Sequence, residues 1–275
     1  MTPAPDRYAV IGHPIAHSLS PWIHAQFAQQ TGQSLIYSAI DVPSAELALR
    51  VREFFARGGR GLNVTVPHKQ AVLQLIDALS EAARLAGAVN TIVPETGQRL
   101  RGENTDGVGF VRDLTLNLGL ALAGQRVLLL GAGGAARGLL GPLLALAPKK
   151  LHIVNRSPER ARELARAFAS RGPVQGSGFE ELDGFDYELI INATAASLSD
   201  ELPALPAGAL SATTVCYDLA YGKAPTRFVQ WARDRGARRT YMGEGMLVEQ
   251  AAESYLLWRG VRPGTAAVLA QLRGT

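Results

Sequence analysis

The stretch Arg126–Gly138 constrains the fold of this chain more than any other segment. Its apolar run Val127–Leu130 leads directly into the pattern Gly131-x-Gly133-x-x-Ala136. An uninterrupted apolar run of this length is typical of a strand buried on both faces of a parallel sheet. The glycines permit a tight turn that brings backbone N–H groups against a pyrophosphate at the N-terminus of the next helix. Because a strand precedes the pattern and a helix follows it, we favour a dinucleotide-binding turn over a turn without ligand.

The next predicted strand indicates which dinucleotide binds. Leu151–Val154 is followed by Asn155-Arg-Ser-Pro158, where NAD-binding domains place an acidic residue on the ribose 2′-hydroxyl. No carboxylate stands there. Arg156 offers a planar set of donors that fits a 2′-phosphate, and Arg160 adds charge one turn later. The same residues also suit a helix start with Ser157 as its cap, so both interpretations stand, and the predicted cofactor is NADP rather than NAD.

Composition excludes several classes of protein. The chain carries 24 arginines and 4 lysines, but its net charge is only +4 and its basic residues are scattered, so no nucleic-acid partner is expected. A single cysteine, Cys216, excludes internal disulfides and cysteine-based zinc sites, and its apolar neighbours predict a core position. The sequence shows neither a signal peptide nor eighteen consecutive apolar residues. We therefore expect a cytoplasmic protein with no membrane partner.

Two serines precede a predicted helix. Ser18-Leu-Ser20-Pro21 leads into a helix expected from Pro21 to about Gln30. Ser20 is predicted to cap that helix, whereas capping does not require Ser18. Two hydroxyls ahead of a helix N-terminus can hold a small carboxylate through neutral donors and the helix dipole. Ser18 and Ser20 are therefore candidates for a carboxylate site, with capping as the structural alternative.

The histidines are predicted to be loop and surface residues. His13 and His17 flank a proline-containing loop, so they do not share a helical face as zinc ligands would. His24 and His68 are assigned to the surface with them. No metal site is predicted.

Lys69 stands where the predicted strand Gly61–Pro67 meets the helix expected after it. Such junctions often face a cleft in β/α architectures, although a lone lysine is more often simply solvated. The chain uses arginine six times as often as lysine, yet has lysine here. Because lysine can be tuned into an acid or base and arginine keeps its proton, Lys69 is a candidate catalytic group.

Two more polar positions stand out. Asn90 lies among apolar residues in Gly87–Val93, and a buried amide needs partners from the backbone or a ligand. Thr105 or Asp106 begins a helix expected to reach Leu118, so either residue can be its cap.

The order of the predicted elements gives an α/β fold with two domains, which 275 residues can form. Residues 1–105 form an α/β substrate unit, and residues 106–240 form a doubly wound Rossmann-type domain. Residues 241–275, with helices ending near Trp258 and following Pro263, are expected to return to the first unit.

Eight short motifs occur in a fixed order along the chain. They are Ser18-Leu-Ser20-Pro, Asn63-Val-Thr-Val-Pro-His-Lys69, Gly87-Ala-Val-Asn-Thr91, Asn104-Thr-Asp-Gly107, Gly131-Ala-Gly-Gly-Ala135, Asn155-Arg-Ser157, Tyr217-Asp-Leu-Ala-Tyr221 and Gly245-Met-Leu-Val-x-Gln250. This ordered set covers nearly the whole chain and resembles the shikimate dehydrogenase family. The resemblance implies an NADP-dependent oxidoreductase of the shikimate pathway of aromatic amino acid biosynthesis, which reduces 3-dehydroshikimate to shikimate.

The resemblance also implies roles for individual residues. Lys69 matches the catalytic acid/base and Asp106 its partner, while monomer and homodimer both stay open. Residues implied to bind the substrate are Ser18, Ser20, Thr65, Asn90, Asp106, Tyr221 and Gln250. Residues implied to contact the cofactor are Gly131, Ala132, Gly133, Gly134, Ala135, Asn155, Arg156, Ser157, Arg160, Thr194, Leu219 and Gly243, together with Glu81.

The chain departs from the family pattern at Ser197-Leu198, Met242 and Glu249. None of these residues belongs to the predicted chemistry. A quinate/shikimate dehydrogenase of broader specificity is the nearest alternative, because quinate differs by a hydroxyl beside its carboxylate. A non-catalytic NADP-sensing module is the alternative from another class, but it would have no use for Lys69, Asp106 and Gln250 together.

Overall fold

The computed structural model describes residues 4–182, 187–196, 201–203, 205 and 210–274. The chain divides into two compact units: Met1–Phe110 with Leu247–Thr275 (unit 1), and Val111–Met246 (unit 2). The divisions fall inside two helices, α4 (Asp106–Arg112) and α8 (Glu244–Arg259). No helix in the described ranges has both the length and the apolar character needed to cross a membrane.

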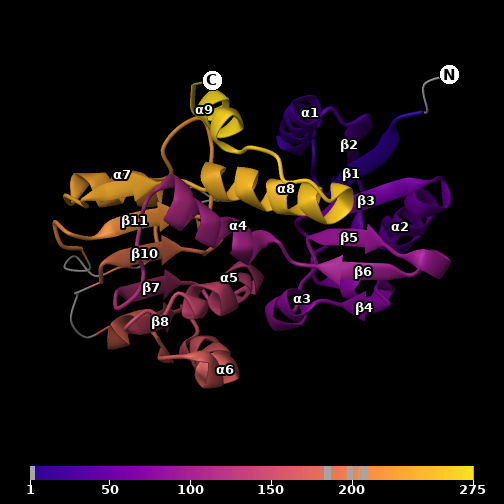
Figure 1. The fold of residues 1–275 in the computed structure, drawn as a ribbon. Helices are drawn as coiled ribbons and strands as arrows, with labels where there is room; N and C mark the ends of the chain where they lie inside the picture. The colour runs from indigo at the N-terminus through magenta and orange to yellow at the C-terminus, as the bar shows by residue number, and fades with distance from the viewer. Residues whose placement is uncertain (1–3, 183–186, 197–200, 204, 206–209, 275) are drawn as a thin grey trace. The chain divides into compact units, whose positions relative to one another are not determined.

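Unit 1 contains a mixed sheet with the strand order β2-β1-β3-β5-β6-β4 (Figure 1). β1 is parallel to β2 and β3, and β4 is parallel to β6, whereas β5 is antiparallel to β3 and β6. The apolar run Tyr8–Ile11 is buried in β1. The strands are β1 Asp6–Gly12, β2 Leu35–Asp41, β3 Gly59–Val64, β4 Ala78–Leu79, β5 Thr91–Pro94 and β6 Leu100–Glu103.

Helices supply the remaining core of unit 1. Val51 and Phe54 of α2 pack with Leu62 of β3, and Phe27 of α1 packs with Tyr255 of α8 in a second buried cluster. The aromatic rings of Phe27 and Tyr255 meet edge to face. The helices that lie wholly in this unit are α1 Ser20–Thr31, α2 Leu47–Ala56, α3 Glu81–Ala86 and α9 Ala266–Gly274.

Unit 2 contains a sheet with the strand order β12-β11-β10-β7-β8-β9 in which every neighbouring pair is parallel. This is the doubly wound order of Rossmann domains, with the reversal between β7 and β10. The apolar run after Arg126 forms β7 as predicted, so the predicted two-domain α/β fold is confirmed. The elements are β7 Arg126–Leu130, α5 Gly134–Ala145, β8 Lys150–Val154, α6 Pro158–Phe168, β9 Val174–Ser177, β10 Leu189–Asn192, β11 Val215–Asp218, α7 Arg227–Asp234 and β12 Arg239–Tyr241.

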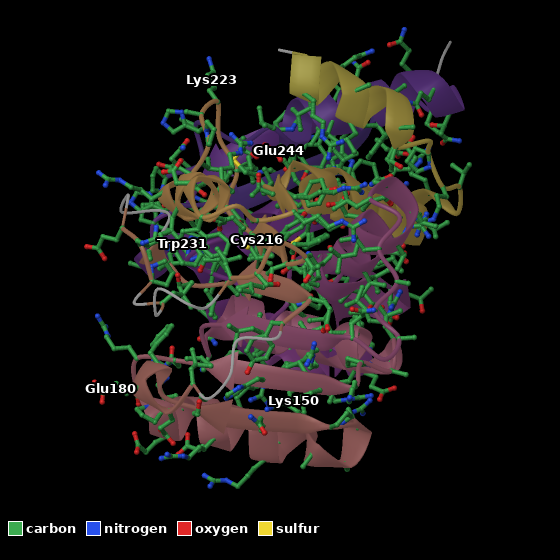
Figure 2. The ribbon with its side chains drawn as sticks, turned by 90° about the vertical axis from the view of Figure 1, so that its left-hand side faces the viewer. Lys150, Glu180, Cys216, Lys223, Trp231 and Glu244 are labelled. Carbon is green, nitrogen blue, oxygen red and sulfur yellow. The ribbon has the colours of Figure 1, made fainter. Side chains whose placement is uncertain are left out.

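Cys216 lies in the core of unit 2. It is part of β11 and packs with Trp231 of α7, whereas Glu180 and Lys223 extend outward (Figure 2). Burial raises the pKa of its thiol to about 12, so the reactive thiolate is suppressed. Cys216 is a core residue, as predicted.

Helix α1 begins differently from the prediction. Leu19 is its N-cap residue and makes no side-chain capping bond, and Ser20 is the first helical residue. The predicted capping role of Ser20 is therefore wrong. Ser18 Oγ instead accepts a hydrogen bond from the backbone N–H of Ser20 at 3.3 Å, which satisfies a donor that a cap would otherwise bind.

Two other predicted helices also differ. The segment after Lys69 forms only a 3₁₀ turn, Ala71–Leu75. The helix that begins at Asp106 changes to a π-helical turn at Asp113–Asn117. Asp113 is buried in that turn and accepts a hydrogen bond from Tyr217 at 2.7 Å, a tertiary contact that local sequence does not reveal.

His24 and His68 are buried, which contradicts their assignment to the surface. His68 Nε2 lies 2.6 Å from the carbonyl oxygen of Val42. His24 of α1 stacks on Tyr37 with ring centroids 4.1 Å apart, and its Nε2 has no hydrogen-bond partner among the described residues. Burial lowers the pKa of His24 to about 3, so the ring is neutral at pH 7.

The neutral His24 makes stability depend on pH. Its pKa rises from about 3 in the folded protein to 6.5 on unfolding, so the unfolded chain binds an extra proton between these values and stability falls as pH drops below 6.5. The loss is ~1.4 kcal/mol per pH unit, or roughly 2–3 kcal/mol by about pH 4.5. We expect His24→Phe to show a shallower decline in the free energy of unfolding, measured in urea at about pH 7 and pH 4.5.

Phe27→Leu is the matched control, because it weakens packing in the same helix without changing a titrating group. It should lower the free energy of unfolding by a similar amount at both pH values. His152, buried in unit 2, has its pKa lowered to about 4, mainly by burial, so part of the decline should persist in both variants. A decline as steep in His24→Phe as in the wild type would contradict the assignment.

Candidate functional site

Polar residues of unit 1 gather at one edge of its sheet. β1 and β3 are parallel, so the loops that follow them leave the sheet at the same edge. β5 is antiparallel to β3 and begins at that edge, and β6, antiparallel to β5, ends there. The predicted residues that follow or precede these strand ends are Ser18, Thr65, Lys69, Asn90 and Asp106.

Lys69 and Asp106 form a close ion pair. Lys69 Nζ donates to Asp106 Oδ2 at 2.6 Å, and their side chains are 29% and 14% exposed. The backbone of Lys69 is fixed by a hydrogen bond from the N–H of Val89 to its carbonyl oxygen at 2.8 Å. A partly sheltered ammonium on a carboxylate can hold a proton and deliver it to a bound molecule. The structure thus brings the predicted pair together.

Asn90 orients the carboxylate of Asp106. The backbone N–H of Thr105 donates to Asn90 Oδ1 at 2.9 Å, which identifies that atom as the acceptor and fixes the amide orientation. Asn90 Nδ2 therefore faces Asp106 and donates to its Oδ1 at 2.8 Å. The two oxygens of Asp106 thus accept from different groups, the Asn90 amide and the Lys69 ammonium.

Donors and acceptors for a polyhydroxylated ligand surround this pair. Gln250 of α8 places its Oε1 3.4 Å from Asn90 Nδ2. The hydroxyl of Thr65 makes no hydrogen bond within the described part of the chain, so it is available to a ligand. Ser18 Oγ accepts from the N–H of Ser20 and keeps its own hydrogen for another acceptor. These groups are suited to bind hydroxyl and carboxylate oxygens.

A layer of buried polar residues behind this edge was not predicted. Tyr37 donates to Asn63 Oδ1 at 2.7 Å, and Asn63 Nδ2 lies 3.0 Å from Oγ of Ser254 on α8. Thr91 Oγ1 lies 2.8 Å from the same hydroxyl and donates to Asn90 Oδ1 at 2.9 Å. Asn63 and Thr91 are polar residues beside apolar runs, which is the signal that identified Asn90. Ser254 and Tyr37 gave no such signal.

The predicted cofactor residues of unit 2 follow the carboxyl ends of its parallel strands. The strand register places Leu130 opposite Val154 and Asn192, and Asn192 opposite Asp218. The segments after these strands therefore emerge along one edge, where dinucleotides bind in doubly wound sheets. Those segments contain Gly131–Ala135, Asn155–Arg160, Thr194, Leu219 and, after β12, Gly243.

The turn after β7 fits a pyrophosphate. Gly131 has φ +103°, a conformation that favours glycine, and a Cβ there would come within 3.0 Å of the Ala193 carbonyl oxygen. Gly133 is the N-cap residue of α5, and no side chain caps the helix. A Cβ on Gly133 would meet no described atom within 4 Å. The first N–H groups of α5 and the space around them thus suit an anion.

Leu219 and Gly243, from different strand ends, lie side by side. The backbone N–H of Gly243 donates to the Ala220 carbonyl oxygen at 3.1 Å. A Cβ at Gly243 would lie only 2.1 Å from the Leu219 carbonyl oxygen. The close approach of these two segments therefore requires glycine at this position.

The turn after β8 offers cationic donors without a competing acid. Arg156 and Arg160 form no ion pair or hydrogen bond with any residue that the structure describes. Asn155 Nδ2 donates to the Ser157 carbonyl oxygen at 3.0 Å and shapes the turn. Ser157 is the N-cap residue of α6 before Pro158, but its side chain makes no capping bond, so the predicted capping bond is absent. These free donors fit the 2′-phosphate of NADP.

Two predicted residues lie in a different unit from the rest of their sets. Tyr221 follows β11 in unit 2, whereas the other substrate candidates lie in unit 1; burial and, to a smaller extent, Glu244 raise the pKa of its phenol. Glu81 is the first residue of α3 in unit 1, whereas the other cofactor candidates lie in unit 2. The roles of both residues stay predictions.

The departures from the family pattern fall at three places in the chain. Ser197-Leu198 lies outside the described residues. Met242 follows β12 directly before Gly243. Glu249 is buried and accepts from Thr265 Oγ1 at 2.6 Å, which ties α8 to the segment before α9.

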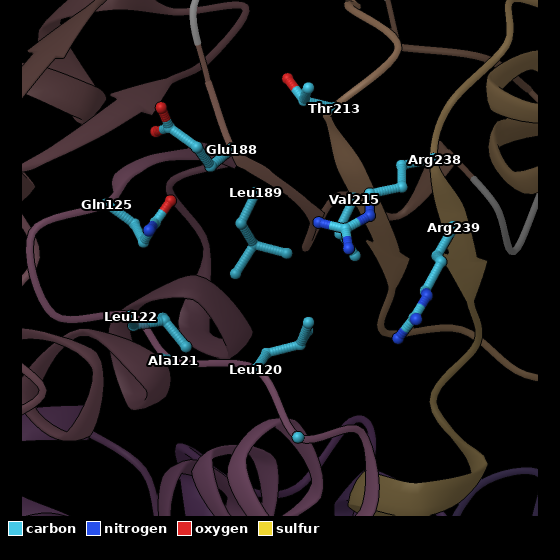
Figure 3. Close-up of a pocket in the computed structure, with 11 residues that line it drawn as sticks. Leu120, Ala121, Leu122, Gln125, Glu188, Leu189, Thr213, Val215, Arg238 and Arg239 are labelled. Atoms are coloured by element: carbon cyan, nitrogen blue, oxygen red, sulfur yellow. The ribbon is translucent and has the colours of Figure 1, made fainter.

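Unit 2 also has a cavity of about 380 Å³ at the amino ends of its strands (Figure 3). Leu189, Val215 and Arg239, which begin β10, β11 and β12, line it together with Leu120 and Arg238. This edge is opposite the carboxyl ends that carry Gly131 and Arg156. No predicted site residue lines the cavity, so it is separate from the proposed cofactor site.

Comparison with known protein families covers most of the chain. The profile described as "Shikimate dehydrogenase substrate binding domain" matches residues 10–92. "Shikimate / quinate 5-dehydrogenase" matches residues 114–199, and "Shikimate 5'-dehydrogenase C-terminal domain" matches residues 243–273.

Individual proteins match along nearly their whole length. The chain is 55% identical to "Shikimate dehydrogenase (NADP(+))" of Thioalkalivibrio sulfidiphilus over 268 residues, 98% of each chain. It is 56% identical to the protein of the same name from Methylococcus capsulatus, covering 98% of this chain and 96% of the relative. Shikimate 5-dehydrogenase from Thermus thermophilus, solved with NADP(H) and shikimate, superposes with a TM-score of 0.86 at 35% identity, covering 98% of this chain and 99% of that one.

Proposed function

The chain belongs to the shikimate dehydrogenase family, and we propose that it catalyses the reversible NADPH-dependent reduction of 3-dehydroshikimate to shikimate. This is a step of the shikimate pathway, which leads to the aromatic amino acids. The observation that carries the proposal is the Lys69–Asp106 pair, 2.6 Å apart and surrounded by groups suited to bind hydroxyls. The names of the relatives and the free donors after β8 support NADP as the cofactor.

Lys69 supplies the proton of the reduction. NADPH, when bound, provides the hydride for the C3 carbonyl carbon, and the carbonyl oxygen gains the electron pair of the broken π bond. The Lys69 ammonium donates a proton to that oxygen and gives the alcohol. In the reverse direction the neutral amine removes the same proton.

Asp106 holds the amine in place and binds a substrate hydroxyl. Its Oδ2 accepts from Lys69 and its Oδ1 from Asn90, so the carboxylate is fixed by two donors before substrate arrives. Such preorganisation avoids reorientation during the reaction. Thr65, Asn90 and Gln250 are proposed to bind the other hydroxyls.

Ser18 and Ser20 are proposed to hold the carboxylate of the substrate. Both hydroxyls lie at the start of α1, where the helix N-terminus favours an anion. Quinate carries a further hydroxyl beside this carboxylate. The small serine side chains favour shikimate but leave quinate as a second substrate to test.

We expect Lys69→Arg and Lys69→Ala both to lower kcat for shikimate oxidation by roughly 10²–10⁴-fold, with a smaller effect on the shikimate KM. Arginine keeps the charge but does not release a proton near neutral pH. Asp106→Asn should lower kcat and also weaken shikimate binding. Turnover is followed at the nicotinamide absorbance.

The double variant Lys69→Ala/Asp106→Asn provides the internal control. If the two residues act as one unit, the double variant should lose much less than the product of the single losses. Near-full turnover in Lys69→Arg would show that the proton comes from another group.

A second prediction concerns the cofactor. Arg156→Ala should raise the KM for NADP about ten- to a hundredfold and change the KM for NAD little, because a charge-assisted bond to the 2′-phosphate contributes roughly 1.5–3 kcal/mol. Arg166→Ala is the matched control, since it removes the same charge from the exposed face of α6, outside the turn after β8. Equal losses with NADP and NAD would contradict the assignment.

A further inference from the structure

Ser254 occupies an unusual position in unit 1. It lies on α8 one turn after Gln250, is fully buried, and its hydroxyl contacts Asn63, Thr91 and Thr105 as well as the carbonyl oxygen of Gln250. A buried hydroxyl costs free energy unless it is well paired. An alanine or valine would meet the needs of a helix core without that cost, so packing alone does not explain a serine here.

The direction of the hydrogen bonds around Ser254 follows from its neighbours. Asn63 Nδ2 shares its two hydrogens among three acceptors, each at 3.0 Å: Ser254 Oγ, Thr91 Oγ1 and the Asn90 carbonyl oxygen. Thr91 donates its single hydroxyl hydrogen to Asn90 Oδ1, so at the 2.8 Å contact between Ser254 and Thr91 the hydrogen comes from Ser254. The same Ser254 hydrogen also faces the Gln250 carbonyl oxygen at 3.1 Å, so these two acceptors share it. Thr91 thus accepts from Ser254 and Asn63 and donates to Asn90.

These bonds join into one series, which we call the polar chain. Its members, each donating to the next, are Tyr37, Asn63, Ser254, Thr91, Asn90 and Asp106. Asn63 also reaches Thr91 directly at 3.0 Å. Bonds that point the same way polarise one another, and this series ends on the carboxylate that holds Lys69.

We propose that Ser254 is a positioning residue of the dehydrogenase, which acts through Thr91 and Asn90 to hold Asp106 in place for Lys69. The proposal rests on the proposed function, since it assigns Asp106 to the reaction. Ser254 itself touches neither substrate nor cofactor. Without the Ser254 hydroxyl, Thr91 Oγ1 keeps only the Asn63 amide as a donor, and its bond to Asn90 Oδ1, one of the two that this oxygen accepts, is held less firmly.

Pairs of side chains with the same shape test this role. Ser254→Val and Ser254→Thr add nearly the same volume, but only threonine keeps the hydroxyl. Thr91→Val removes the next hydroxyl of the polar chain with almost no change of shape. We expect Ser254→Val and Thr91→Val each to lower kcat/KM for shikimate about ten- to a hundredfold. Ser254→Thr should recover most of the activity lost in Ser254→Val, and the KM for NADP should stay constant throughout.

The double variant Ser254→Val/Thr91→Val should lose about as much kcat/KM as Thr91→Val alone, because Ser254 acts only through Thr91. Tyr255→Phe is the control. It removes a 2.6 Å hydrogen bond to Thr31 from the next residue of α8, so it should lower Tm without changing kcat/KM. All assays are made well below the Tm of each variant.

The outcomes separate the two proposals. A wild-type protein that does not oxidise shikimate with NADP overturns the proposed function, and this inference with it. If the wild type is active, equal kcat/KM in Ser254→Val and Ser254→Thr overturns the role of Ser254 alone. The role of Ser254 is also overturned if the valine variants lower Tm but leave kcat/KM unchanged. It is overturned as well if the losses of kcat/KM multiply in the double variant.

Discussion

The need to pair buried polar groups governs the arrangement around Lys69. Asn90 is almost fully buried, and its amide must find partners on both sides. The backbone N–H of Thr105 claims its oxygen, which leaves its nitrogen for Asp106. Asp106 then has one oxygen left for Lys69. The position of the Lys69 ammonium thus depends on the hydrogen bonds that Asn90 and Thr105 make. Leaving some of these buried polar groups unpaired would cost more free energy than an apolar core.

In unit 2 the strand register determines where the ligand-binding turns lie. Hydrogen bonds between parallel strands place Leu130, Val154 and Asn192 at one level, so the turns that follow them share one edge. Side chains reinforce this edge: Asn192 Oδ1 accepts from the hydroxyl of Thr194 at 2.7 Å, and Asp218 Oδ2 accepts from Thr226 at 2.6 Å. Turns held by such bonds have less conformational freedom to lose when a ligand binds along this edge.

The two units offer different kinds of group to a ligand. Unit 2 offers backbone N–H groups and the free guanidinium of Arg156, which suit phosphates. Unit 1 offers neutral hydroxyls and amides around a single ion pair, which suit a hydroxylated substrate with one carboxylate. Burial of neutral His24 lowers the free energy of unfolding at low pH, although the proposed reaction makes no use of this residue. The stacking of its ring on Tyr37 connects it to the polar chain.

Local sequence determined the features that depend on neighbouring residues. The buried strand and glycine turn at Gly131, the absence of an acid beside Arg156 and the lysine at a strand end could all be predicted from short-range patterns. Tertiary structure decided the rest. Ser254 contacts Asn63 across 191 positions of the chain, and no periodicity reports such a contact. The predicted exposure of His24 was wrong because its ring packs against Tyr37 and against Tyr255 of α8. The predicted cap at Ser20 was wrong because α1 begins at that residue, whose N–H bonds to Ser18 Oγ.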